Sequence, residues 1–114
     1  MSEEKNTGAM PEAEAIKIPE LLEYQTGAVV SRTLVKNSSG TVTLFAFDKG
    51  QGLSEHSAPF DALVMVQDGE CEIKIGGKPI KTKAGQSVLM PANIPHALTA
   101  TKKFKMLLVM VRGK

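Results

Sequence analysis

The feature that most limits how this chain can fold is the regular spacing of turn-forming residues after residue 27. Short apolar and β-branched runs alternate there with glycine, proline and asparagine. The runs AVVSRTLV (28–35) and TVTLFAFD (41–48), separated by KNSSG, predict an antiparallel hairpin. Further strands are predicted over residues 60–67, 71–75, 78–83, 86–90, 96–101 and 104–112. Short strands with turns every eight to twelve residues or so are typical of an all-β barrel or sandwich.

Two dipeptides in the middle of the chain predict tight turns. Asp68-Gly69 is a strong hairpin signal, because both central residues of the favoured two-residue turn need positive φ. Gly76-Gly77 predicts a second turn, from the run ending at residue 75 into KPIKTK. We therefore expect separate strands on each side of both dipeptides.

The first residues differ from the rest in composition. Residues 1–15 are rich in Glu, Ala, Gly and Pro, which predicts a flexible N-terminal tail. IKIPELLEYQ (16–25) fits either a short helix or an extended arm lying on another surface. Residues 16–114 are long enough for one barrel domain and too short for two.

Composition excludes several classes of protein. The formal net charge is only +2, and the basic C-terminal end carries few aromatic residues, so no nucleic-acid partner is expected. The N-terminus lacks the apolar core of a signal peptide, and no run reaches the roughly 20 apolar residues that span a bilayer. The expectation is a soluble, cytoplasmic protein without a membrane partner. Cys71 is the only cysteine, so no intrachain disulfide can form, and we expect it to be a buried apolar residue.

Two spaced motifs carry the chemistry of the sequence. In the first, Gly50 is followed by five residues and His56, with Ala58, Ala62 and a closing Gly69 after it. In the second, Gly85 is followed by five residues and Pro91, and then by Asn93, His96 and Ala100.

These motifs resemble the paired motifs of the cupin superfamily over residues 27–112, most closely the small single-domain cupins of bacteria and archaea. The resemblance implies a double-stranded β-helix, or jelly-roll barrel, preceded here by the short helix or arm. Many cupins hold a metal on three His and one Glu. In this chain His56 and His96 keep two of those positions, while Ala58 and Ala62 replace the second His and the Glu. Asn93 replaces a glycine, a mild change because Asn tolerates left-handed backbone.

The implied site lies inside the barrel. On an unbroken strand, His56, Ala58, Ala62 and Val64 would share one face, because side chains of even-numbered residues point the same way. Asp61 falls on the opposite face by the same rule. The predicted pocket is therefore lined by His56 and His96 with small or apolar neighbours.

Three functions remain open at this level. The first is binding of a small organic molecule, such as one with a carboxylate or carbonyl, with a weak or absent metal site. The second is a metal-dependent enzyme of the dioxygenase, isomerase or decarboxylase type seen among cupins, with Zn, Ni, Fe or Mn on His56 and His96. The third is a regulatory or scaffold dimer. The catalytic residues and the cofactor are unknown from the sequence.

The apolar strands predict a homodimer. Residues 60–67 and 104–112 have apolar side chains on both faces, so something must cover the outer face. A second copy of the chain is the simplest cover, through Leu63, Met65, Leu107 and Val109, with residues 16–35 as a segment that could cross to the partner.

Overall fold

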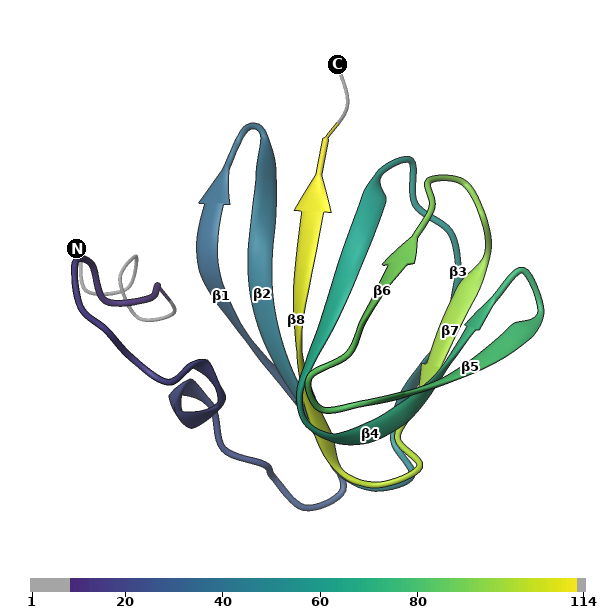
Figure 1. Cartoon of the computed structure of the whole chain (residues 1–114), viewed down its shortest axis with the longest axis horizontal. Helices are drawn as coiled ribbons and strands as arrows, with labels where there is room; N and C mark the ends of the chain where they lie inside the picture. Colours follow the sequence, from purple (N-terminus) through teal and green to yellow (C-terminus); the bar gives the residue numbers. More distant parts are fainter. Residues whose placement is uncertain (1–8, 113–114) are drawn as a thin grey trace.

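The computed structural model describes residues 9–112, which form a curled β structure with a single turn of helix (Figure 1). No helix in this range is long and apolar enough to cross a membrane. The 3-10 turn η1 (Ile18–Leu21) precedes all the strands. The strands are β1 (Val29–Asn37), β2 (Gly40–Phe47), β3 (Gly52–His56), β4 (Asp61–Ile75), β5 (Lys78–Lys83), β6 (Ser87–Met90), β7 (His96–Thr99) and β8 (Phe104–Val111).

Two antiparallel sheets share the long strand β4. The first sheet has the order β1-β2-β8-β4-β6, and the second has the order β5-β4-β7-β3. The predicted hairpin over residues 28–35 and 41–48 is confirmed, since β1 pairs antiparallel with β2. The sheets curl toward each other around the core (Figure 1). The expected jelly-roll barrel is thus the observed fold.

The prediction of a tight turn at Asp68-Gly69 was wrong. β4 runs unbroken through the dipeptide, which lies where the register with β8 shifts. Residues 61–69 of β4 pair with β8, some of them also with β6, whereas residues 70–75 pair with β5 and β7. Gly69 does adopt a positive φ of 72°, but this conformation bends the strand from one sheet into the other. The Gly76-Gly77 turn, in contrast, joins β4 to β5 as predicted.

The expectation that His56, Ala58 and Ala62 share one strand face was also wrong. β3 ends at His56, β4 begins at Asp61, and residues 57–60 between them belong to neither strand. Pro59 lies in this break, and proline cannot donate a hydrogen bond to a sheet ladder. Even and odd numbering therefore does not fix which way these side chains point.

The core fills the space between the two sheets. On β4 the side chains of Ala62, Val64 and Val66 are buried, while the alternate positions are only partly covered. Phe47 and Phe104 stack at the centre of this core with ring centroids 4.5 Å apart. Cys71 is fully buried here, and this burial raises the pKa of its thiol to about 12, so the thiol stays protonated.

An N-terminal arm covers part of the outer face of the first sheet. The arm is extended apart from η1, so it combines the two structures expected for residues 16–25. Its apolar side chains pack on a small cluster formed by Leu34, Leu44 and Leu107; they are Met10, Ile18, Leu21 and Leu22. The tail expected over residues 1–15 falls partly on residues 1–8, which lie outside the described range.

Side chains of the barrel hold this arm by hydrogen bonds. The Lys105 ammonium, almost fully buried, donates to the Pro19 carbonyl at 2.6 Å. Arg32 donates to the carbonyl of Leu21 at 2.8 Å. The Tyr24 hydroxyl donates to the Asp68 carboxylate at 2.6 Å, and thereby joins the arm to the bulge in β4. Apolar packing and these bonds together fix the arm on the barrel of its own chain.

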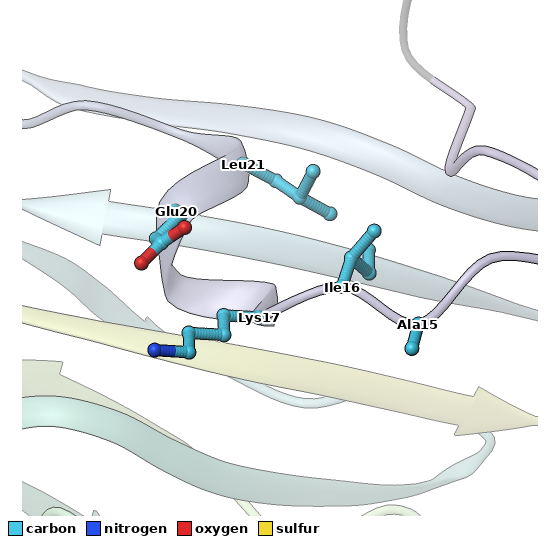
Figure 2. Close-up of a pocket in the computed structure, with 5 residues that line it drawn as sticks. All are labelled: Ala15, Ile16, Lys17, Glu20 and Leu21. Carbon is cyan, nitrogen blue, oxygen red and sulfur yellow. The ribbon is translucent and has the colours of Figure 1, made fainter.

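Figure 2 shows a hollow of about 550 Å³ that is lined by residues of this arm. Its lining consists of Ala15, Ile16, Lys17, Glu20 and Leu21. Ile16 and Leu21 lean toward each other, whereas Lys17 extends to the other side (Figure 2). Lys17 and Glu20 are exposed to solvent, so the hollow has no buried polar groups that converge on a ligand.

Candidate functional site

The structure brings His56 and His96 together. His56 is the last residue of β3 and His96 is the first residue of β7, and the two are paired directly across the antiparallel ladder. Their ring centroids lie 4.5 Å apart with an angle of 75° between the ring planes. Close approach of these strands requires Gly52, because a Cβ there would collide with the backbone carbonyl of Leu98.

Backbone carbonyls fix both rings in the same tautomer. His56 Nδ1 lies 2.8 Å from the Ser54 carbonyl oxygen, and His96 Nδ1 lies 3.2 Å from the Ile94 carbonyl oxygen. A carbonyl oxygen only accepts hydrogen bonds, so each Nδ1 carries the proton and donates. In the neutral ring the lone pair then belongs to Nε2.

The two rings differ in burial, and this burial affects the pKa of His96. His56 is exposed, whereas His96 is only 4% exposed. Burial lowers the pKa of His96, the neighbouring His56 lowers it further, and the Ile94 carbonyl opposes these effects. His96 is consequently neutral at physiological pH.

The Nε2 atom of His96 remains accessible despite this burial. The ring's hydrogen bond is made by Nδ1, and within residues 9–112 no buried side-chain nitrogen is left without a partner. The small exposed part of the ring therefore includes Nε2.

Two hydrogen bonds join the loop that follows His56 to the loop that precedes His96. The Asn93 N–H donates to the Ala58 carbonyl at 2.7 Å, and Ala92 N–H donates to the Asp61 carboxylate at 2.9 Å. Asn93 has a φ of 66°, the left-handed conformation expected where it replaces glycine. Asp61 thus holds the second motif in place, a role that sequence reasoning missed because nothing along the chain pairs it with residue 92.

The other predicted site residues lie in different surroundings. Ala58 is half-buried in the loop after His56. Ala62 and Val64 are buried in the core cluster, together with Met90 and Met106. The described residues 9–112 contain no group of three or more His, Cys, Asp or Glu side chains that could hold a metal ion. The candidate site is therefore a pair of imidazoles without a third metal-ligating side chain among these residues.

Comparison with protein families identifies the fold. The sequence model of the cupin domain matches residues 43–112, which include both motifs. The chain belongs to the cupin family. Among curated proteins, no match to this cupin is found.

Solved structures resemble this cupin closely. A conserved protein of unknown function from Streptococcus pyogenes is 37% identical, with a TM-score of 0.88 and 92% of each chain covered. A cupin 2 conserved barrel domain protein from Leptotrichia buccalis is 48% identical with a TM-score of 0.80; the match covers 82% of this chain and 46% of that one. A cupin superfamily protein from Desulfitobacterium hafniense is 25% identical, with a TM-score of 0.86 and coverage of 91% and 95%. This cupin thus spans less than half of the Leptotrichia protein.

Proposed function

We propose that this cupin binds a small molecule at the imidazole pair of His56 and His96. The proposal rests on one observation: two adjacent imidazoles, 4.5 Å apart, each have Nδ1 engaged by a carbonyl and leave Nε2 available. Ala58, half-buried and two residues after His56, adds no charge there. Convergent polar atoms with apolar neighbours are the usual composition of a small-molecule site.

A thermal-shift screen of small metabolites tests this proposal. A true ligand at 100 times its Kd stabilises the folded protein by about 2.7 kcal/mol, so the melting temperature rises measurably. We expect the shift to vanish in His96→Gln, which removes the imidazole at similar size, and to persist in Thr99→Ala, an exposed position on the same strand β7. A screen in which no metabolite separates the wild type from His96→Gln contradicts the proposal.

A metal-dependent reaction is the second candidate. The two Nε2 atoms supply two nitrogen ligands, whereas catalytic zinc sites usually have three protein ligands. The donor set therefore fits a weakly held Zn, Ni, Fe or Mn ion whose remaining positions go to water or substrate. When bound, such an ion would polarise a carbonyl or activate water, as dioxygenase, isomerase or decarboxylase chemistry requires.

Calorimetric titration with Zn²⁺ tests the metal alone. We expect His56→Ala and His96→Ala each to weaken zinc binding by at least about tenfold, since each removes one of two ligands. Glu55→Gln removes an exposed charge next to His56 and serves as the control, with little change expected. Unchanged zinc affinity in the double histidine variant would place the ion elsewhere and remove this candidate.

We also propose that the outer face of the first sheet mediates a homodimer. One register row crosses the whole sheet and is aliphatic in every strand; its members are Val35, Val42, Val109, Leu63 and Leu89. Leu89 is 57% exposed and Val35 49% exposed, at opposite ends of the row. Of the expected contact residues, Leu107 is covered by the arm and Met65 packs beside it, so the proposed interface centres on Leu63 and Val109.

Analytical ultracentrifugation at micromolar concentration tests the dimer. Leu89→Lys places a charge in the row at an already exposed position, so the fold should tolerate it. We expect the dimer dissociation constant to rise by at least about tenfold, because an unpaired charge would be buried at the interface. Ile94→Lys, an exposed apolar residue outside that sheet, should leave it unchanged. A wild-type protein that sediments as a monomer contradicts the proposal.

A further inference from the structure

The imidazole pair offers hydrogen-bond acceptors without donors. Both Nδ1 atoms are occupied by the carbonyls of Ser54 and Ile94. A neutral imidazole has one N–H, so each ring has only an acceptor left, at Nε2. Each ring of the pair therefore presents one lone pair, at Nε2, to whatever binds there.

From this geometry we infer that the ligand of the His56–His96 pair is a hydrogen-bond donor, a compound carrying hydroxyl or protonated amine groups. The inference rests on the proposed small-molecule function and narrows its substrate class. A carbonyl or carboxylate oxygen next to Nε2 would place two hydrogen-bond acceptors against each other. Both atoms would then lose their water without gaining a hydrogen bond, which costs free energy. The ligand class thus differs from the carboxylate or carbonyl compound expected from the sequence.

Two backbone groups in the loops next to the pair are already engaged within the protein. The Ala58 carbonyl, in the loop after His56, accepts from Asn93. The nearby Ala92 N–H is likewise engaged, since it donates to the Asp61 carboxylate. The Ala92 N–H is therefore not available as a donor to a ligand at the imidazoles. One acceptor on each of two neighbouring rings matches a ligand that carries two donors.

Three aromatic probes of similar size separate the ligand classes. Resorcinol carries two hydroxyl donors, 1,3-dimethoxybenzene has the same skeleton with acceptors only, and benzoate is an anionic acceptor. Binding is followed at pH 8, in the presence of EDTA, by the ¹⁵N chemical shifts of the two imidazoles, which also report the tautomer. This pH lies above the usual histidine pKa of about 6.5.

We expect the free protein to show protonated Nδ1 and unprotonated Nε2 in both rings. Resorcinol should shift both Nε2 signals and bind at least about tenfold more tightly than either other probe, with the difference abolished in His96→Gln. Equal or tighter binding of dimethoxybenzene or benzoate at the imidazoles, or an unprotonated Nδ1, would overturn the donor class while leaving the proposed small-molecule site intact. If none of the three probes perturbs either imidazole, the small-molecule site itself is refuted and the proposed function fails with it.

Discussion

Replacing Gly69 by alanine is expected to destabilise the barrel by about 2–5 kcal/mol, as measured by urea denaturation followed by circular dichroism. The residue has a φ of 72°, which costs alanine about 1–2 kcal/mol. An added Cβ would also collide with the backbone carbonyl of Lys103, which cannot move away as a flexible side chain can. Overpacking of this kind costs a further 1–3 kcal/mol or so.

Gly77→Ala is the matched control for this prediction. Gly77 has a φ of 85°, but a Cβ there would meet nothing within 4 Å. The control therefore retains the backbone cost, about 1–2 kcal/mol, and lacks the collision. Similar losses of stability in the two variants would mean that β4 does not need the close approach to Lys103 at its bend.

Phe104→Ala is expected to cost about 3–5 kcal/mol, the usual range for deleting a buried phenylalanine ring. Phe104 is fully buried and stacks on Phe47 with the ring planes only 8° apart. It also pairs with Gly69 across the β4–β8 ladder, so the cavity would open beside the bend between the sheets. Because the bend is backbone, the surroundings can collapse only partly into the space.

Phe60→Ala provides the comparison for the core variant. The Phe60 ring is half-buried and contacts the Arg112 guanidinium at 5.2 Å from its centroid. A partly exposed cation–π contact contributes about 0.5–1 kcal/mol, so the loss should be much smaller. The same denaturation experiment should show a lower urea midpoint for Phe104→Ala with an unchanged slope. Equal midpoints for the two variants would contradict the central position assigned to Phe104.

Local signals in the sequence predicted most of the strands but not how one of them crosses between sheets. The hairpin of β1 and β2 and the Gly76-Gly77 turn follow from residues adjacent in the chain. Asp68-Gly69 carries the same local signal as a turn, yet the partners that keep β4 extended there, Lys105 and Phe104, lie far along the chain. A glycine in the sequence indicates that a positive φ is possible. Whether that φ forms a strand bend or a hairpin turn depends on which distant strands pair there.

At the site, the sequence identified the histidines but not their surroundings. The motif spacing singled out His56 and His96, which the structure places across one strand ladder. The break before β4, which separates His56 from Ala62, has Pro59 as its only local signal. The tautomers depend on the carbonyls of Ser54 and Ile94, and every residue type has the same carbonyl, so no sequence pattern marks them.

The anchoring of the N-terminal arm has a consequence for how this region can change in evolution. Arg32 and Lys105 each donate a hydrogen bond to a main-chain oxygen of the arm, that of Leu21 and that of Pro19. Every residue has a main-chain oxygen, whatever its side chain. Substitutions of polar residues in the arm therefore leave these two acceptors in place. The barrel side of each anchor depends on its side chain instead, because replacing Arg32 or Lys105 would remove the donor.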